Sequence, residues 1–348
     1  MNRKKLVVLM ALAISVLLFS FAESNYFTIS RSDVVLHIPD GFPKPVYKFK
    51  NNKLTPEKFV LGRMLFNDPI LSKDSSTSCA SCHQRVAAFG HIDHTLSHGI
   101  YGMIGKRNVP ALQNLIWKDA YMWDGSIKHL EEQSLGPISS PIEMDESIDN
   151  IVIKLNRHIE YRQRFSDAFG TDEITKEMVL KSLTQFVGLM ISSDARYDRY
   201  LNGRDTFSIQ EKQGLALFRA NCASCHKEPL FTDNSYRNNG LSVDSTLNDK
   251  GRGVVSLLPA DVNKFKVPSL RNVEMTYPYM HDGRYKRLRD VVNHYSGRTR
   301  QVMDADDDVK KIPVLSDKDK TDIVAFLLTL TDKTFLNDRR FIDPFVKL

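Results

Sequence analysis

The chain has 348 residues, of which 42% are hydrophobic and 26% are charged. This balance is typical of a globular protein and argues against intrinsic disorder, and the length suits two modest domains better than one. The formal net charge is +6 at pH 7, but residues 3–5 alone carry three of these positive charges. The remaining excess is too small to predict a nucleic-acid partner.

The N-terminus has the pattern of an export signal. A basic start at residues 3–5 precedes an apolar run at residues 6–21, and a small-x-small site predicts cleavage after Ala22. The run is slightly long for a signal peptide, so an uncleaved membrane anchor stays open as the alternative. We therefore expect residues 1–22 to direct the protein to the periplasm, either cleaved off or anchoring it to the inner membrane.

Helices dominate the predicted secondary structure. Thr55 followed by proline is a typical helix start and predicts a helix over residues 56–67. Apolar residues at helical spacing predict another helix over residues 174–192. Capping boxes that begin at Ser208 and Ser316 predict two more helices in the second half. No pattern predicts a long strand, so the expected fold class is mostly α with little strand.

The two halves of the chain share one sequence plan. Cys-Ala-Ser-Cys-His occurs at residues 79–83 and again at residues 222–226, each time after a Gly-x-x-Leu-Phe segment. A second match, Val-Pro-x-Leu-x-Asn, begins at Val109 and at Val267, and Tyr-Met-x-Asp-Gly follows both at the same offset. Matches that keep their spacing over such a length indicate an internal duplication.

Cys-x-x-Cys-His is the attachment signature of a c-type haem. The two thiols form thioethers with the vinyl groups of the porphyrin, and the adjacent imidazole is then held under the iron as an axial ligand. Four cysteines in an exported protein would otherwise favour disulfides, but a histidine directly follows each pair. We therefore predict two covalently bound haem c groups, held by Cys79, Cys82 and His83 and by Cys222, Cys225 and His226.

The expected fold is thus two c-type cytochrome-like domains related by internal duplication. Their limits are placed at residues 40–200 for the N-terminal domain and 208–335 for the C-terminal domain. The sixth ligand of each iron decides whether a haem only shuttles electrons or also activates an oxidant. Residue types and spacing alone leave this choice open.

The chain resembles the bacterial dihaem cytochrome c peroxidase family, which includes the MauG-like enzymes that mature methylamine dehydrogenase. The likeness runs from about Thr55 to Leu330, and its motifs begin at Arg107 (Arg-Asn-x-Pro), Trp123 (Trp-Asp-Gly), Leu130 (Leu-Glu-Glu-Gln), Pro141 (Pro-Ile-Glu-Met) and Val267 (Val-Pro-x-Leu-Arg-Asn). The resemblance implies reduction of hydrogen peroxide to water at the N-terminal haem, through a ferryl intermediate. The C-terminal haem would receive electrons from a cytochrome c, a cupredoxin or a quinol-linked donor.

The resemblance also implies roles for individual residues. Glu143 and Gln133 match the pair that lines the family's peroxide pocket, where a buried carboxylate can move a proton between the two oxygens and an amide can orient them. Trp123 matches the tryptophan between the two haems. His98 matches a histidine that caps the iron of the N-terminal haem in the resting state of some members.

Two metal-site expectations follow from the same resemblance. An interdomain calcium ion would be held by oxygen ligands, for which the matching residues are Asn108, Thr276 and Pro278. Tyr295 stands where other peroxidases of the family carry the methionine ligand of the C-terminal haem. Met280 and Met303 stay as alternatives for that ligand, because the assignment assumes no gap in the alignment after His281.

Three functions are weighed on this basis. The leading one is a dihaem peroxidase. A MauG-like oxidase that acts on a partner protein is the alternative favoured by Tyr295, because an anionic phenolate stabilises oxidised iron. A dihaem electron carrier without catalysis is disfavoured by Gln133 and Glu143, for which a carrier has no use. A homodimer is compatible with each of the three.

Overall fold

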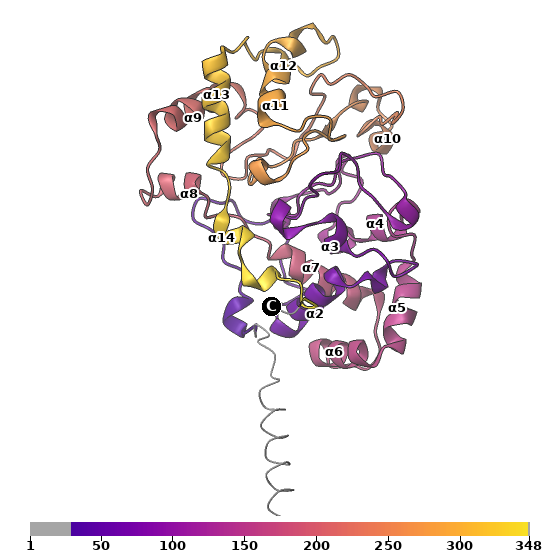
Figure 1. The fold of residues 1–348 in the computed structure, drawn as a ribbon. Coiled ribbons are helices and arrows are strands. Elements are labelled where there is room, and N and C mark those ends of the chain that lie inside the picture. Colours follow the sequence, from indigo (N-terminus) through magenta and orange to yellow (C-terminus); the bar gives the residue numbers. More distant parts are fainter. Residues whose placement is uncertain (1–28, 347–348) are drawn as a thin grey trace, which may run out of the picture.

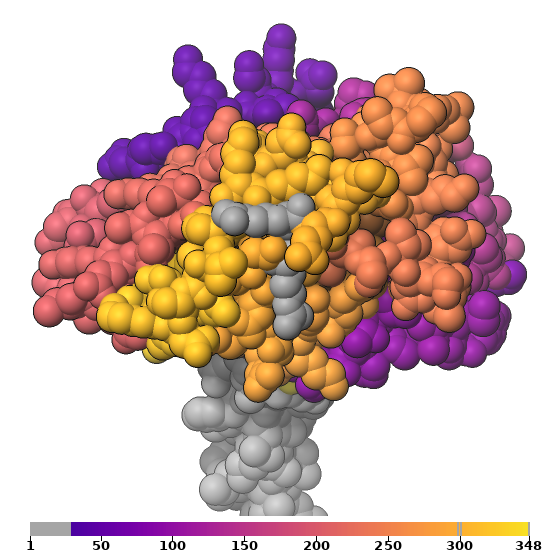
Figure 2. Space-filling view, turned by 90° about the horizontal axis from the view of Figure 1, so that it is seen from above, coloured from indigo at the N-terminus to yellow at the C-terminus, as the bar shows by residue number. Residues whose placement is uncertain are grey.

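A computed structural model describes residues 29–346 of the chain. The export signal expected at residues 1–22 lies outside the described residues. Within them, no helix is both long enough and apolar enough to cross a membrane. Figure 1 shows two lobes stacked along the long axis of the molecule, and Figure 2 shows the C-terminal lobe covering the N-terminal one, which is visible at its edges.

The secondary structure is mostly helical, as predicted. The N-terminal lobe contains α2 (Pro56–Asn67), α3 (Cys79–Cys82), α4 (Leu135–Ser139), α5 (Ile148–Arg157), α6 (Ile159–Phe169) and α7 (Lys176–Gly188). The C-terminal lobe contains α8 (Arg196–Leu201), α9 (Ile209–Asn221), α10 (Gly253–Ser256), α11 (Leu288–Tyr295), α12 (Asp307–Lys310) and α13 (Asp317–Leu328). The chain then continues into α14 (Lys333–Leu336). The strands in the described part are β1 (Tyr236–Arg237) and β2 (Phe265–Lys266), which pair antiparallel.

The predicted helix starts are confirmed. Helix α2 begins after Thr55, whose side chain accepts a hydrogen bond from the amide of Lys58. Ser208 and Ser316 form the capping boxes of α9 and α13. Polar side chains that bond the free amides of a first turn stabilise a helix by about 1 kcal/mol each. Because such residues are favoured at helix starts, the starts of these three helices could be predicted from the sequence.

The helix predicted over residues 174–192 is shorter at both ends and spans α7, Lys176–Gly188. The C-terminal part of the predicted range leaves the helix because another segment binds it. The backbone amide of Ser192 donates to Asn114 Oδ1 over 3.0 Å, and Asn114 Nδ2 donates to the Ser192 carbonyl over 3.1 Å. Tertiary hydrogen bonds therefore override the helical pattern there.

Each lobe is built on one pair of crossed helices, α2 with α7 and α9 with α13. The glycine that begins each repeated Gly-x-x-Leu-Phe segment stands at the crossing. A Cβ atom added at Gly62 would lie 2.0 Å from the carbonyl oxygen of Ser182, and one at Gly214 would lie 1.9 Å from that of Asp322. The repeated glycine is thus explained by the close approach of two helix backbones.

The duplication is also visible in the backbone of the Tyr-Met-x-Asp-Gly loops. The loop at residues 121–127 is closed by a bridge between its end residues, and so is the loop at residues 279–285. Met122 and Met280 occupy equivalent places and both have left-handed backbone, with φ of 66° and 76°. Two copies of one unusual turn support the interpretation of the chain as two related haem-binding units.

The two hydrophobic cores do not follow the expected domain limits at every point. Tyr197 of α8 packs in the core of the C-terminal lobe, although it precedes residue 200. Phe335 and Phe341 pack in the core of the N-terminal lobe, so the end of the chain returns to its beginning beside α2. The limits 40–200 and 208–335 stay predictions. The packing indicates that the chain crosses from the N-terminal lobe to the C-terminal lobe near residue 195 and crosses back near residue 332.

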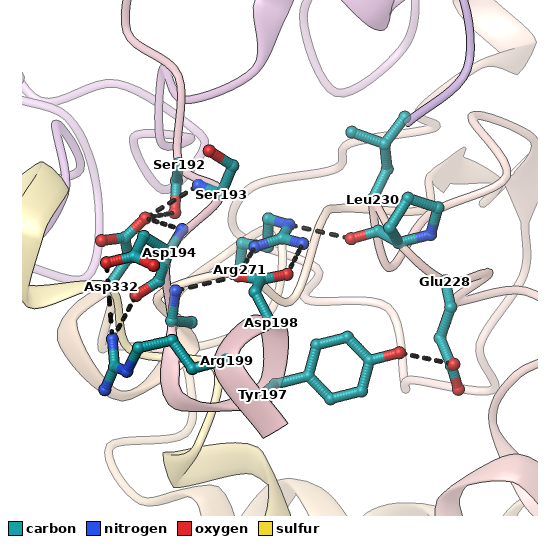
Figure 3. Close-up of polar contacts among 12 residues, drawn as sticks. Ser192, Ser193, Asp194, Tyr197, Asp198, Arg199, Glu228, Leu230, Arg271 and Asp332 are labelled. Carbon is teal, nitrogen blue, oxygen red and sulfur yellow. Dashed lines mark hydrogen bonds and ion pairs between the residues drawn. The ribbon is translucent and has the colours of Figure 1, made fainter. Parts of the chain in front are cut away.

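A buried carboxylate joins these two crossings (Figure 3). Asp332 is 1% exposed, and one of its oxygens accepts hydrogen bonds from Ser192 Oγ at 3.0 Å, the Ser193 amide at 2.8 Å and the Asp194 amide at 2.9 Å. The other oxygen accepts from the amide of Phe335 at 2.9 Å. The segment that leaves the N-terminal lobe is therefore bonded to the segment that returns to it.

We predict that Gly62→Ala destabilises the protein by about 1–3 kcal/mol, because the added methyl group forces α2 and α7 apart. Chemical unfolding of the purified holoprotein, followed by circular dichroism, would measure the loss. Lys212→Ala on the exposed face of α9 is the matched control and is expected to change stability by less than about 0.5 kcal/mol. Equal stability of Gly62→Ala and the wild type would contradict the close-packed crossing.

Candidate active site

Each Cys-x-x-Cys-His motif opens onto a cavity of its own. The N-terminal cavity has a volume of about 330 Å³, and the C-terminal cavity has a volume of about 280 Å³. The motif residues that line the first are Cys79, Cys82 and His83, and those that line the second are Cys222, Cys225 and His226. The structure therefore brings the two thiols and the imidazole of each motif to one space.

Local structure sets the orientation of the first motif. Ser78 caps the single turn of α3 and accepts a hydrogen bond from the amide of Ser81. Cys79 and Cys82 begin and end this turn, and residues three apart in a helix share one face. Both thiols could therefore bond the same porphyrin, and the imidazole of the next residue, His83, would be available to its iron.

Both motif histidines present one ring nitrogen to the cavity. His83 Nδ1 lies 2.7 Å from the carbonyl oxygen of Phe89, and His226 Nδ1 lies 3.0 Å from that of Phe231. A proton on Nδ1 donates to the carbonyl, which leaves the lone pair of Nε2 for a metal. Burial lowers the pKa of His83 to about 4 and also lowers that of His226, so both rings are neutral at pH 7, as a ligand must be.

The loop that supplies the carbonyl to His226 is held by a buried ion pair (Figure 3). The Arg271 guanidinium is 0% exposed and bonds both carboxylate oxygens of Asp198, at 2.7 and 2.9 Å. Arg271 Nε also donates to the carbonyl of Pro229 at 2.8 Å, and its guanidinium packs on the ring of Phe231. The arginine of the Val-Pro-x-Leu-Arg-Asn motif therefore orients the loop whose carbonyl bonds His226.

The chemistry of haem c matches both cavities. It needs a pair of thiols, an imidazole with a free nitrogen and an apolar space between two protein walls. All four cysteines are free thiols, and Leu112 and Val109 are among the apolar residues that line both cavities. We conclude that the residues of both motifs fit haem c.

The side chains expected to act on peroxide gather at the N-terminal cavity. Gln133, which directly follows the 3₁₀ turn Leu130–Glu132, lines it together with Glu143 and His98. Burial raises the pKa of Glu143, and a hydrogen bond with Ser140 partly opposes this rise. A carboxyl group with a raised pKa holds its proton to a higher pH than an exposed one, which suits it to donate a proton as well as to accept one.

The His98 loop packs directly on the turn that carries Glu143. The amide of Ile100 donates to the carbonyl of Glu143 at 2.8 Å. A Cβ atom added at Gly99 would lie 2.1 Å from the carbonyl oxygen of Ile142 and 2.5 Å from Glu143 Cα. The Ser-His-Gly sequence thus has a packing reason for its glycine, because the two loops touch through their backbones.

Two further histidines lie beside His98. The ring centroids of His94 and His98 are 4.4 Å apart, and those of His91 and His94 are 4.8 Å apart. Within residues 29–346, however, no group of three or more histidine, cysteine, aspartate or glutamate residues is placed to hold a metal ion. The three rings contact one another, and His98 is the one of them that lines the cavity.

Trp123 lies on the wall between the two cavities and lines both. Its Nε1 donates to the backbone carbonyl of Asn108 at 2.8 Å. The backbone N–H of Asn108 donates in turn to the backbone carbonyl of His281 at 2.6 Å. His281 is the counterpart of Trp123 in the second copy, and its ring stacks on that of Phe265 with centroids 3.6 Å apart. The equivalent positions of the two halves are thus joined through one asparagine.

Location in the structure distinguishes among the candidate sixth ligands of the C-terminal haem. Tyr295 and Met280 both line the C-terminal cavity, and Asn239 Nδ2 lies 3.3 Å from the Tyr295 hydroxyl and 3.6 Å from Met280 Sδ. Met303 is 92% exposed and lies away from the cavity, which removes it as an alternative. The structure therefore leaves the tyrosine and one methionine.

The three residues expected at calcium share the wall of the C-terminal cavity: Asn108, Thr276 and Pro278. The side-chain nitrogen of Asn108 donates to the carbonyl of Thr95 at 3.0 Å, so its side-chain oxygen faces away from that bond. Oxygen atoms of this kind are the ligands that calcium prefers. The calcium site stays a prediction.

An ion-pair cluster near Trp123 was not found from the sequence. Arg107 lies 2.6 Å from Asp124 and 2.6 Å from Asp249, which comes from the C-terminal lobe. The Arg-Asn-x-Pro and Trp-Asp-Gly motifs are therefore two ends of one interaction. Both motifs are among those that carry the family resemblance, but their spacing in the sequence does not indicate that their side chains form an ion pair.

The fold and the paired cavities define a dihaem c-type cytochrome. Residues 56–206 match the family model described as di-haem cytochrome c peroxidase, and residues 211–331 match the model described as cytochrome c. The predicted fold class and the two haem c groups agree with this match. The cofactor of each lobe is thus haem c.

Similar proteins cover most of the chain. It is 38% identical over 303 residues to the methylamine utilization protein MauG of Methylorubrum extorquens, which covers 84% of this chain and 82% of that protein. It is 36% identical over 290 residues to the cytochrome c551 peroxidase of Nitrosomonas europaea, which covers 80% of this chain and 82% of that protein. The chain belongs to the dihaem cytochrome c peroxidase family and is an oxidoreductase.

Among solved structures, the fold is similar to that of a MauG-like protein associated with microbial copper homeostasis. The TM-score is 0.82 at 30% sequence identity, and the match covers 89% of this chain and 99% of that one. The arrangement of the two lobes is therefore shared with an experimentally determined member of the same group.

We expect Gly99→Ala to retain both haems but to lower peroxide turnover by about tenfold or more, because the methyl group pushes the His98 loop away from Glu143. Steady-state kinetics with a reduced dye as electron donor would measure kcat. Met103→Ala, a change to a 44% exposed side chain in the same loop, serves as control and should retain full activity. Unchanged turnover in Gly99→Ala would show that the loop contact has no part in the reaction.

Proposed function

We propose that the protein reduces hydrogen peroxide at the N-terminal cavity with electrons that arrive through the C-terminal one. The observation that carries the proposal is one cavity lined by His83, the half-buried carboxyl of Glu143 and the amide of Gln133. Partial burial of a carboxyl group is costly, and a pure electron carrier has no use for one beside its haem. Relatives named cytochrome c peroxidase support the same activity.

When bound, haem c supplies the electrons that peroxide accepts. Glu143 accepts the proton of the inner peroxide oxygen and donates it to the outer oxygen, so that the outer oxygen leaves as water. Gln133 donates a hydrogen bond that orients the peroxide across the cavity. In total, one peroxide takes up two electrons and two protons and yields two water molecules.

Trp123 is proposed to relay electrons between the cavities. The support is its place on the shared wall and the hydrogen bond that fixes its indole to Asn108. An indole can be oxidised and reduced reversibly, whereas the aliphatic side chains that share this wall cannot. His98 is proposed to cap the N-terminal iron in the resting enzyme, because its side chain lines that cavity.

We also propose a bound calcium ion, a class of electron donor and a cellular location. A calcium ion bound by Asn108, Thr276 and Pro278 would stabilise the wall between the lobes. The electron donor would be a small cytochrome c or cupredoxin, or a quinol-linked protein. The protein would act in the periplasm, as the basic and apolar N-terminal pattern indicates.

A second candidate function is oxidation of a partner protein, which the resemblance to MauG-like enzymes implies. Relatives named methylamine utilization protein MauG cover most of the chain. The specific observation in its favour is Tyr295 at the C-terminal cavity. A phenolate ligand favours ferric iron and would make this haem a poor acceptor from a high-potential donor. The same ligand would help the protein to hold two oxidising equivalents.

Glu143→Gln tests the acid–base role. We predict that this variant binds both haems but loses peroxide turnover by about a hundredfold or more, since an amide cannot pass the proton. Turnover would be measured at saturating peroxide, with haem content determined for each sample. Glu132→Gln, an exposed glutamate on the preceding turn, is the control. If Glu143→Gln turns over normally, the role given to Glu143 is wrong.

Tyr295→Phe and Met280→Leu together identify the sixth ligand of the C-terminal haem. We expect Tyr295→Phe to change the low-spin electron paramagnetic resonance signal of the ferric protein, and Met280→Leu to leave it unchanged. The opposite result would assign the ligand to Met280, would favour a higher potential for this haem and would weaken the case for oxidation of a partner protein.

A further inference from the structure

Two lysines line the C-terminal cavity from the two lobes. Lys118 follows the 3₁₀ turn Leu115–Trp117 of the N-terminal lobe, and Lys266 lies in β2 of the C-terminal lobe. The amide of Lys266 donates to the carbonyl of Trp123 at 2.7 Å, which places this residue beside the shared wall. Neither lysine belongs to a haem attachment motif or to the set that acts on peroxide.

The protein offers these two ammonium groups little compensating charge. Within residues 29–346, the Lys118 ammonium forms no hydrogen bond or ion pair. Lys266 is 6% exposed, and its Nζ lies 3.2 Å from the carbonyl of Asn234 and 3.5 Å from the carboxylate of Asp119. That carboxylate is 68% exposed, so water screens its charge.

A pair of cations beside an apolar cavity, of which only Lys266 lies near a carboxylate, is unfavourable. Burial lowers the pKa of Lys118 to about 8, and the charge of Lys266 lowers it further in the same direction. Burial also lowers the pKa of Lys266. An anionic group bound between them would offset this cost. The cavity therefore has the charge of a binding site for carboxylates.

Haem c itself carries two carboxylates. Its propionates extend from the edge of the porphyrin opposite to the edge that forms the thioethers. In this cavity the thioether edge is set by Cys222 and Cys225, which directly follow α9, while the lysines lie at the boundary with the other lobe. We propose that Lys118 and Lys266 bind the propionates of the C-terminal haem and thereby seat that haem against the lobe boundary.

This contact has a consequence for electron transfer. Two positive charges at the propionates favour the extra electron on the iron, so they raise the reduction potential of the C-terminal haem. Their effect would oppose that of an anionic tyrosine ligand. The N-terminal lobe, through Lys118, would thus adjust the potential of a haem attached to the C-terminal lobe.

The test is a redox titration of the purified dihaem protein, with each haem followed by its own absorption and paramagnetic signals. Lys118→Met should reduce the ratio of ferrous to ferric C-terminal haem at a given applied potential by about tenfold. Lys118→Arg should retain the wild-type ratio. Lys128→Met removes the same charge from an exposed neighbour outside the cavity, and it should change the ratio by less than about twofold.

A wild-type ratio in Lys118→Met, with both haems attached, would overturn the proposal. So would an equal shift in Lys128→Met, because a general charge effect would then explain the change. If Lys118→Met fails to mature, Lys118→Gln keeps a polar side chain without the charge and should show the same tenfold loss. These readouts do not involve peroxide, so they are independent of the proposed peroxidase activity.

Discussion

The hydrogen bonds from Trp123 through Asn108 to His281 determine how the two halves of the molecule meet. They join equivalent positions of a duplicated unit. Residues of the N-terminal lobe supply one wall of the C-terminal cavity, whereas Asp249 is the residue of the C-terminal lobe that lines the N-terminal cavity. The C-terminal lobe on its own would therefore lack one wall of its cavity. The ion pair of Arg107 with Asp249 reinforces the same contact from the polar side.

The shared wall also explains the division of labour between the copies. Duplication made the cavities alike in their thiols and axial histidines, and the differences lie in what faces the ligand from the opposite side. Of the two cavities, Glu143 lines the N-terminal one and Gln133 lines both, whereas Tyr295 and Met280 line the C-terminal one. One cavity thus receives the carboxyl group proposed to transfer protons, and the other receives candidate ligands that would close the iron.

The parts of the site that could be predicted from the sequence are those encoded by local spacing. The motif at residues 79–83 and its copy, the capped helices and the mostly helical fold all depend on residues close together in the chain. Asp249 and Lys118 could not be found in this way, because their importance comes from long-range packing. The packing of Phe335 in the N-terminal lobe was missed for the same reason, since no local pattern tells a chain end which core it will join.

The carboxylate of Asp332 bonds both segments that cross between the lobes, and it makes the duplicated units inseparable. In a simple tandem repeat, each unit would contain all the residues of its own hydrophobic core. Here the second unit begins with residues near Tyr197, and the end of the chain completes the first. A cut between the two units would therefore remove core residues from both, so the dihaem pair is best engineered as one piece.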